Sequence, residues 1–291
     1  MKVLVTGSNG FVGKEVVKEL KRKKCQIIEY DAANGKDILN EEQLEKEMKH
    51  AEAIIHLAGI VENENPDLWK VNVEGTEKVA KAAAKTKVKK LIFMSSTGVY
   101  GIPTGIINEK STVKPENQYE KSKAEAEKII LGVCDKVNVC IVRSAMVFGA
   151  NEYWKKMFKM LEKKYPLPCP GTNTFQVIYV KELARAIGKV LEKGKNGEIY
   201  LASGREKKTL NEFCEIAQKE MGLKQGIKHV PTALGVIAGK ILGIKLLTIE
   251  NIRHLSKERN YDTGKIEKLG WKQQTTLEKA MKEVIKELEI K

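Results

Sequence analysis

Short apolar runs alternate with segments of helical periodicity through much of the chain. Runs rich in Val, Ile and Leu lie at residues 2–7, 26–31, 53–59, 90–96, 138–144 and 197–203. Their continuous apolar character predicts strands buried on both faces, as in a parallel sheet. Segments with the helical period lie at residues 11–24, 41–49, 66–86, 117–132 and 181–192. The alternation predicts an α/β fold built on a doubly wound parallel sheet.

The regular alternation fades after about residue 150, where helical segments and a Pro-rich turn region follow. This predicts a smaller, mostly helical C-terminal lobe over the carboxyl edge of the sheet, where ligands bind in open α/β folds. We expect the sheet domain to comprise residues 1–150 and 175–203. The substrate lobe would then comprise residues 151–174 and 204–291.

One stretch of that lobe is unusually apolar, the sequence VPTALGVIAGKILGIKLL at residues 230–247. Glycine recurs at every fourth position, at Gly235, Gly239 and Gly243. That spacing makes a smooth stripe for close helix packing. Lys240 and Lys245 interrupt the run, so we do not expect a transmembrane span. A buried lobe helix is one interpretation; an apolar pocket wall or a membrane-touching element is the alternative.

Composition and charge narrow the class of protein. The chain has 291 residues, of which 42% are hydrophobic, as in a globular protein. The net charge is +14, but 46 of the 52 basic residues are Lys, interleaved with Glu along the predicted helices. This pattern is typical of solvated helix faces, and it resembles a thermophile surface. Surfaces that read nucleic acid favour Arg, so no clear nucleic-acid or membrane partner is expected.

The five cysteines are scattered and include no C-x-x-C pair. They indicate reduced thiols rather than a disulfide framework, and no metal site is expected. The N-terminal residues run straight into the first predicted strand and turn without a cleavage site. We therefore expect a cytoplasmic protein.

A glycine-rich turn, TGSNGFVG, follows the first predicted strand and opens a helix. Gly7, Gly10 and Gly13 allow a tight turn, close approach of a pyrophosphate and tight helix–strand packing. The helix N-terminus supplies free amides and a partial positive charge for phosphates. This strand–turn–helix context predicts a dinucleotide site in the sheet domain.

Acidic residues after the second strand bear on the choice of dinucleotide. Asp31 ends that strand, where a carboxylate accepts hydrogen bonds from the ribose hydroxyls and repels a 2′-phosphate. This favours NAD over NADP. Asp37 and Ile38 would face the adenine, although a solvent-facing Asp37 is an equal alternative.

Tyr119 and Lys123 lie one helical turn apart in the sequence QYEKSKAEAE. A free phenol has a pKa of about 10, too high for a base near neutral pH. A neighbouring ammonium favours the phenolate and would lower that pKa. The spacing alone is weak evidence, because it occurs again at Tyr261 and Lys265, around Gly264.

Taken in order, several short motifs resemble those of the extended short-chain dehydrogenase/reductase family. They are TGSNGFVG, HLAG (56–59), VNVEGT (71–76), FMSSTGVYG (93–101), YEKSK (119–123), IVRSAMVFG (141–149) and LGW (269–271). The resemblance covers nearly the whole chain. It implies a Rossmann-type fold and an NAD-dependent oxidoreductase of the epimerase/dehydratase or the dehydrogenase/reductase kind.

The resemblance also assigns roles to residues. Ser96, Tyr119 and Lys123 would form the catalytic group, with Tyr119 as the base. Ser96, Thr97 and Met146 would meet the substrate. His56 is expected to be a packed or cofactor-edge side chain, and Asn72 a brace near the cofactor. The expected cofactor-binding residues are Gly7, Asn9, Gly10, Phe11, Val12, Gly13, Asp31, Asp37, Ile38, Leu57, Ala58, Gly59, Asn72, Tyr119 and Lys123.

The substrate stays open at this point. We favour a nucleotide-sugar epimerase or dehydratase, although Met146 and Ser144 replace the Asn and Pro common in that branch. No Arg has a convincing context for a diphosphate, and the candidates are Arg185, Arg205, Arg253 and Arg259. One alternative resembles 3β-hydroxysteroid dehydrogenase and dihydroflavonol reductase, acting on an apolar alcohol or ketone.

A second alternative is a nucleotide-sensing or RNA-binding protein on the same fold, but it would have no use for a complete Ser–Tyr–Lys group. The family's four-helix interface, if present, would pair residues 66–86 and 117–132 with their copies in a homodimer.

Overall fold

Six parallel strands form the central sheet of the protein. In this computed structural model, residues 1–86, 88–224, 226–241, 243 and 247–290 are described. The strand order is β2-β1-β3-β4-β5-β8. The strands are β1 (Lys2–Thr6), β2 (Gln26–Tyr30), β3 (Ala53–His56), β4 (Lys90–Ser96), β5 (Asn138–Ser144) and β8 (Glu198–Ala202). All the pairings are parallel, and the predicted doubly wound sheet is confirmed.

The order reverses at β1, since the chain places β2 on one side of it and β3 on the other. In open α/β sheets such a switch point leaves a crevice at the carboxyl ends of the strands. The glycine-rich turn follows β1, so it lies at this crevice.

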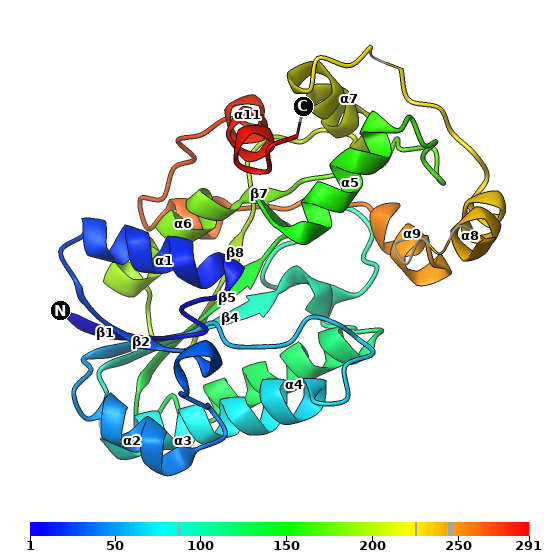
Figure 1. The fold of residues 1–291 in the computed structure, drawn as a ribbon. Coiled ribbons are helices and arrows are strands. Elements are labelled where there is room, and N and C mark those ends of the chain that lie inside the picture. The colour runs from blue at the N-terminus through cyan, green and yellow to red at the C-terminus, as the bar shows by residue number, and fades with distance from the viewer. Residues whose placement is uncertain (87, 225, 242, 244–246, 291) are drawn as a thin grey trace.

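Helices cover both faces of the sheet (Figure 1). One face carries α1 (Phe11–Arg22) and α6 (Val180–Lys193), and the other carries α2 (Glu41–Met48), α3 (Thr76–Thr86) and α4 (Gln118–Leu131). Side chains alternate between the two layers, as strand geometry requires. Val3 and Val5 pack in the layer with α1 and α6, whereas Leu4 packs in the layer with α2 and α3.

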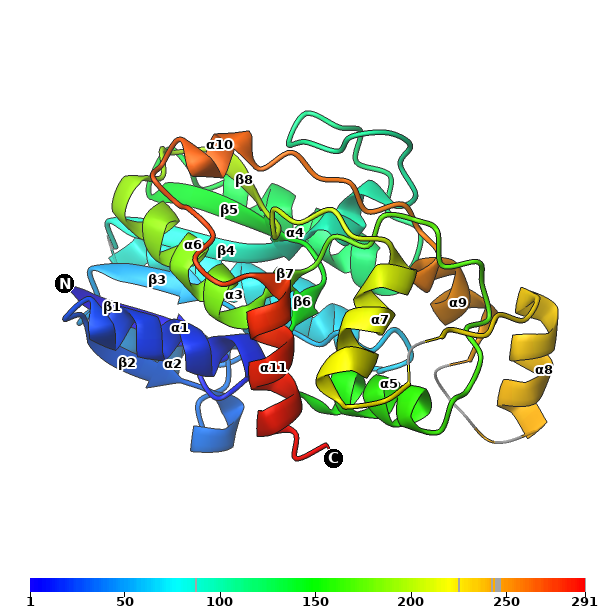
Figure 2. The same ribbon diagram turned by 90° about the horizontal axis from the view of Figure 1, so that it is seen from above.

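The remaining helices form a smaller lobe beyond the sheet, which Figure 2 shows from above. They are α5 (Glu152–Glu162), α7 (Leu210–Glu220), α8 (Thr232–Ile241), α9 (Ile249–Leu255) and α11 (Leu277–Glu287). Its core is aromatic: Phe148, Trp154, Phe158 and Phe213 are fully or almost fully buried and meet edge to face or tilted. A short parallel pair, β6 (Val147–Phe148) and β7 (Ile178–Tyr179), joins the lobe to the sheet.

The chain returns to the sheet domain near its C-terminal end. Tyr261, Ile266 and Trp271 pack in the same core cluster as Val3 and Val5, and α10 (Gly264–Glu267) contacts β8. The residue boundaries expected for the two domains stay a prediction.

Helix α8 lies within the apolar 230–247 segment, of which residues 242 and 244–246 lie outside the described part. Gly235 and Gly239 are buried, as the glycine stripe predicts, but its third member, Gly243, lies in a turn beyond α8 and is exposed. Leu234, Ile237 and Ile241 are exposed as well. Helix α8 is therefore only half buried, unlike the fully buried lobe helix that was one interpretation of the sequence. At the edge of the lobe, protein packs against only one of its faces. Within the described residues, no helix has the length and apolar character needed to cross a membrane.

Candidate functional site

Gly7 and Gly13 let backbone segments approach closely at the turn after β1, where a side chain would clash. Gly7 has a φ of +69°, and a Cβ there would lie 2.7 Å from the backbone nitrogen of Ala58. A Cβ on Gly13 would lie 2.0 Å from the carbonyl oxygen of Gly7. No L side chain fits at these distances, so the first turn of α1 rests directly on the turn after β1.

The N-terminus of α1 opens next to this turn. Gly10 is the N-cap, and the helical hydrogen bond from Lys14 N to Gly10 O is 3.1 Å long. The amides of Phe11, Val12 and Gly13 precede that bond and have no acceptor one turn earlier in the helix. Amides in this position, at the positive end of the helix dipole, suit a phosphate group.

Asp31 follows β2 directly, beside the turn, and its carboxylate accepts hydrogen bonds from two backbone amides. Its Oδ2 accepts from Asn9 N at 2.9 Å, and its Oδ1 accepts from Ala33 N at 3.0 Å. The second bond caps a short 3₁₀ helix, η1 (Ala32–Asn34). The carboxylate thus braces the glycine-rich turn and lies where the sequence predicts a ribose contact.

Asp37 and Ile38 have different surroundings. Asp37 is exposed, and its Oδ1 accepts from Leu39 N at 2.9 Å. Ile38 is buried in the core of the α2–α4 layer, where its Cδ1 would lie 2.6 Å from a Cβ added to Gly75. Packing therefore accounts for Ile38 fully, and the adenine contact stays a prediction.

His56, at the end of β3, is held as a neutral imidazole. Its Nδ1 lies 2.7 Å from Thr6 Oγ1, and its Nε2 lies 3.0 Å from Thr76 Oγ1. Because Thr76 donates its own proton to Asn72 O at 2.6 Å, it must accept from His56 Nε2–H. Complete burial, and secondarily the charge of Lys123, lowers the pKa of His56 to about 3. His56 is therefore a packed, uncharged side chain rather than a base.

Asn72 connects the segment after β3 to α4. It lies in a π-helical turn, η2 (Lys70–Gly75), that precedes α3. Its Oδ1 accepts from Ile60 N at 2.8 Å, and its Nδ2 donates to Ile60 O at 2.8 Å and to Ser122 Oγ at 3.0 Å. These bonds fix the strand-end residues Leu57, Ala58 and Gly59 relative to the helix that carries Tyr119.

Tyr119 lies in the first turn of α4, and its phenol is close enough to Ser96 for the serine hydroxyl to lower its pKa. Its backbone N–H donates to Asn63 Oδ1 at 2.9 Å, and Ser96 Oγ also accepts from Gly98 N at 3.0 Å. Burial raises the pKa of Tyr119 to about 12; the bond to Ser96 lowers it and the charge of Glu120 raises it. With the protein groups alone, desolvation of the phenolate sets the direction of the shift. The lowering expected from Lys123 together with the charge of the oxidised cofactor stays a prediction.

Lys123 is 4% exposed and lies beneath the strand ends. Its Nζ donates to Met94 O at 3.1 Å and stands 4.9 Å from the centre of the Phe93 ring. A Cβ on Gly59 would lie 3.3 Å from Nζ, so the glycine at this position leaves room for the Lys123 ammonium. Burial lowers the pKa of Lys123 to about 8, and the charge of Glu127 opposes the shift. The side chain is still mainly charged at neutral pH.

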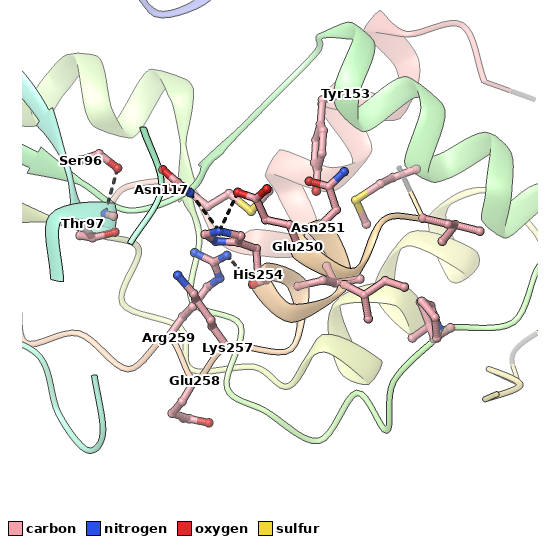
Figure 3. Close-up of a pocket in the computed structure, with 18 of the residues that line it drawn as sticks. Ser96, Thr97, Asn117, Tyr153, Glu250, Asn251, His254, Lys257, Glu258 and Arg259 are labelled. Carbon is pink, nitrogen blue, oxygen red and sulfur yellow. Dashed lines mark hydrogen bonds and ion pairs between the residues drawn. The ribbon is translucent and has the colours of Figure 1, made fainter. Parts of the chain in front are cut away.

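A cavity of about 340 Å³ opens at the carboxyl edge of the sheet, between the sheet and the lobe. Ser96, Thr97, Tyr119 and Met146 all line it, so the residues predicted to meet the substrate gather around one space. Its apolar wall comes from the α5 region, the segment after α8, and α9: Met157, Met160, Leu161, Leu167, Leu247, Ile252 and Leu255. In Figure 3, Ser96 and Thr97 stand at one end of the view, and Tyr153 is well separated from them.

A polar cluster at this cavity joins the lobe to the catalytic helix, and no sequence motif pointed to it. Glu120 Oε1 lies 3.3 Å from Lys257 Nζ, which also donates to Gly101 O at 3.0 Å. Lys257 and Glu120 are 7% and 2% exposed. Asn117, the N-cap of α4, lies 3.1 Å from Nε2 of His254, and Figure 3 shows these side chains pointing toward each other.

Of the arginines considered for a diphosphate, Arg259 lines the cavity. Its terminal nitrogen donates to His254 O at 2.8 Å, but its buried Nε has no hydrogen-bond partner within the described structure. The other three lie outside this cavity and pair with carboxylates: Arg185 with Glu182, Arg205 with Glu267, and Arg253 with Glu116.

Tyr261 and Lys265 do not form a second catalytic pair. The hydroxyl of Tyr261 lies 3.0 Å from Thr97 Oγ1, whereas Lys265 Nζ pairs with Glu198 Oε2 at 2.5 Å. Despite Gly264, a short helix does begin there, α10. Tyr261 still matters, because it lines the cavity and helps to position Thr97.

Comparison with known proteins agrees with this architecture. The chain is 24% identical to an N-acetyl-alpha-D-glucosaminyl-diphospho-ditrans,octacis-undecaprenol 4-epimerase of Escherichia coli O157:H7, over 96% of this chain and 92% of that protein. Among solved structures, a dTDP-glucose 4,6-dehydratase of Bacillus anthracis in complex with NAD is 25% identical, with a TM-score of 0.81. That match covers 99% of this chain and 96% of the other.

A UDP-glucose 4-epimerase of Thermotoga maritima with UDP-glucose has the same fold, with a TM-score of 0.82 and 21% identity. The match covers 98% of each chain. The sequence model of the NAD dependent epimerase/dehydratase family matches residues 3–203, more than half of the chain. The resemblance drawn from the motifs is thereby confirmed: this chain is a member of the NAD dependent epimerase/dehydratase family.

Proposed function

We propose that the protein transfers a hydride between NAD and a carbinol of a nucleotide-sugar, with Tyr119 as the base. The observation that carries this proposal is that Ser96 and Tyr119 both line the wall of one cavity, with the Ser96 hydroxyl close enough to lower the pKa of the Tyr119 phenol. The cavity lies at the carboxyl edge of the sheet, to which the glycine-rich turn also belongs. The proposed acid–base group and the glycine-rich turn thus lie at the same edge of the sheet.

The residues at the sheet edge fit a dinucleotide. The turn at Gly7 and Gly13 excludes side chains, and the α1 amides at Phe11, Val12 and Gly13 suit a pyrophosphate. Asp31 suits a ribose, and Lys123, next to Gly59, suits the second ribose. Bound NAD supplies a hydride acceptor and, when oxidised, a positive charge.

The phenol of Tyr119 needs more than one cation to act as a base. Moving its pKa from about 12 to near 7 takes about 7 kcal/mol. A single charge about 4 Å away supplies about 4 kcal/mol at an effective dielectric constant of about 20. The pKa of about 12 already contains the effect of the protein's own charges, Lys123 included. The positive charge of oxidised nicotinamide is therefore the addition on which the proposal relies, and it supplies about half of the required shift.

In the forward step, Tyr119 takes the proton from the substrate hydroxyl as the hydride leaves the same carbon, and a carbonyl forms. Ser96 holds the substrate oxygen through its hydroxyl. In an epimerase or dehydratase the hydride later returns to the sugar, so the cofactor ends unchanged. Lys123 keeps its charge near the phenol throughout, which stabilises the phenolate.

Arg259 supports a diphosphate-bearing substrate over a purely apolar one. Among the described residues its buried Nε has no acceptor, and an arginine fork suits the oxygens of a diphosphate. The apolar wall at Met157, Met160 and Leu247 is the observation that keeps an apolar alcohol or ketone as the second candidate.

Ligand-dependent melting separates these candidates. We expect UDP-sugars, in the presence of NAD, to raise the melting temperature, and hydrophobic ketones to leave it unchanged. Arg259→Gln should lose most of the shift caused by UDP-sugars and keep the shift caused by NAD alone. Stabilisation by hydrophobic ketones alone would establish the second candidate.

Asp31→Ala should weaken the preference for NAD over NADP. The loss of a charged acceptor for the ribose hydroxyls is worth about 1.5–3 kcal/mol, or roughly tenfold to one hundredfold in KM for NAD. The measurement is kcat/KM with each dinucleotide. Asp31→Asn is the matched control, since its amide oxygen can still accept from Ala33 N and cap η1. An unchanged ratio in both variants would refute the role of the carboxylate.

We also propose that the protein forms a homodimer through α3 and α4 and that it is located in the cytoplasm. Light scattering of the purified protein reports the first.

A further inference from the structure

The outer face of α8 carries a row of exposed apolar side chains. Leu234, Ile237 and Ile241 are 56%, 53% and 78% exposed. Their spacing of three and four residues places them on the same side of the helix. Single exposed apolar residues are ordinary, but an aligned row on one helix indicates a contact surface.

The inner face of α8 is firmly packed, so the outward row is not the result of a detached helix. Gly235 and Gly239 are buried, and a Cβ on either would lie 2.4 Å from the Cβ of Pro168 or Leu247 respectively. Both of these neighbours line the cavity. Figures 1 and 2 both show α8 at the edge of the lobe, next to α9 and far from α2.

The sequence around α8 is basic and lacks acidic residues. From residue 221 to residue 249 there is no Asp or Glu, although the whole chain has 38 in 291 residues. The same stretch contains Lys224, Lys228, Lys240 and Lys245. A backbone bridge pairs Leu167 with His229, which brings the neighbouring segment after α5, with its exposed lysines Lys163 and Lys164, toward this region.

We propose that the outer face of α8 docks on an anionic lipid bilayer. An apolar row in a stretch of sequence that contains lysines and no acidic residue has the two features of a peripheral membrane helix: apolar area to insert and positive charge to meet anionic headgroups. A second copy of the chain would bring the same positive charges together, so charge complementarity favours the bilayer over self-association.

This inference does not depend on the proposed reaction. It has a consequence for the cavity, because Leu247 touches both the inner face of α8 and the cavity. Docking through α8 would place the apolar cavity wall one helix away from the lipid.

The test uses the full chain and vesicles of two compositions, phosphatidylcholine alone and phosphatidylcholine mixed with phosphatidylglycerol. We expect the protein to co-sediment with the anionic vesicles at low salt, and to bind the neutral vesicles and the high-salt samples more weakly. The variant Ile237→Glu/Ile241→Glu should bind the anionic vesicles at least about tenfold more weakly. Both positions are exposed, so melting curves should show an unchanged fold.

A matched control removes the effect of net charge. The α8 variant and the variant Lys46→Ala/Lys49→Ala both lower the net charge from +14 to +12, but the second changes only exposed residues at the far side of the protein, on and just after α2. We expect the control to bind nearly as the parent does, and the neutral variant Ile237→Ser/Ile241→Ser to bind weakly.

Three results would overturn the proposal. They are failure of the parent to bind anionic vesicles, equal loss in the α2 control and the α8 variant, and a change of oligomeric state in the α8 variants. The last would show that a second copy covers α8.

Discussion

Replacing Tyr119 by Phe is expected to lower kcat by at least about 100-fold, and up to about 10,000-fold, because the variant has no group to accept the substrate proton. The phenol lies at the cavity wall near Ser96, and a phenyl ring keeps nearly the same volume and packing. Affinity for NAD should change little, since the turn, Asp31 and Lys123 are untouched. Turnover and NAD binding by titration measure the two effects separately.

A tyrosine next to the same cavity supplies the control. Tyr261→Phe removes the hydroxyl that contacts Thr97 but no proposed acid–base group. Its kcat should fall far less than that of Tyr119→Phe. Equal losses in both variants, or full activity in Tyr119→Phe, would refute Tyr119 as the base.

Replacing Arg143 by Met is expected to lower the free energy of unfolding by about 3–5 kcal/mol, because the Glu127 carboxylate would remain buried without its guanidinium partner. Arg143 on β5 and Glu127 on α4 form a fork, with Nε–Oε1 and Nη2–Oε2 distances of 2.9 and 2.6 Å. Their side chains are 4% and 5% exposed. Arg143 also donates to Tyr100 Oη at 2.8 Å, and Ser95 donates to Glu127 at 2.5 Å.

The chain offers two comparisons for this prediction. Removing both charges, in Arg143→Met/Glu127→Leu, should recover a large part of the loss, because no uncompensated charge stays buried. Lys81→Met breaks an ion pair with Glu77 on the surface of α3, where the side chains are 59% and 47% exposed. That change should leave the free energy of unfolding almost unchanged, because solvent screens an exposed pair. Urea denaturation measures all three, and equal losses for Arg143→Met and Lys81→Met would contradict a buried-pair penalty.

The Arg143–Glu127 pair also bears on the proposed catalytic group. Glu127 lies one helical turn beyond Lys123 on α4, and its charge raises the pKa of Lys123 against the effect of burial. A variant that loses Glu127 should therefore hold Lys123 less fully charged at neutral pH. The same buried pair thus contributes to the fold and to the charge that the phenol of Tyr119 needs.

The sequence by itself determined the helices and strands of the sheet domain and the glycine-rich turn. Strand burial, helical period and the glycine spacing are local patterns, since each depends on residues within one or two turns of each other. They predicted the parallel sheet, the turn at Gly7 and Gly13, and the position of Tyr119 and Lys123 on one helix. The family motifs then placed Ser96 and Met146, which the structure brings to the same cavity.

The surroundings of these residues depended on the tertiary structure. Lys257 meets Glu120 across 137 positions of sequence, and no local pattern records such a pair. The same holds for Arg259, which sequence could not separate from three other arginines. The spacing of Tyr119 and Lys123 could not show that burial raises the pKa of the phenol, because burial is a property of the whole fold, whereas the spacing is a property of one helix.

For α8, the apolar sequence predicted a helix, but only packing decided which of its faces met protein. Gly235 and Gly239 meet Pro168 and Leu247, and this contact turns Leu234, Ile237 and Ile241 outward. Local sequence thus determined the elements and the reactive groups. Long-range packing determined which groups are desolvated, which charges are paired and which surface is left for a partner, because these depend on neighbours that only the folded chain brings together.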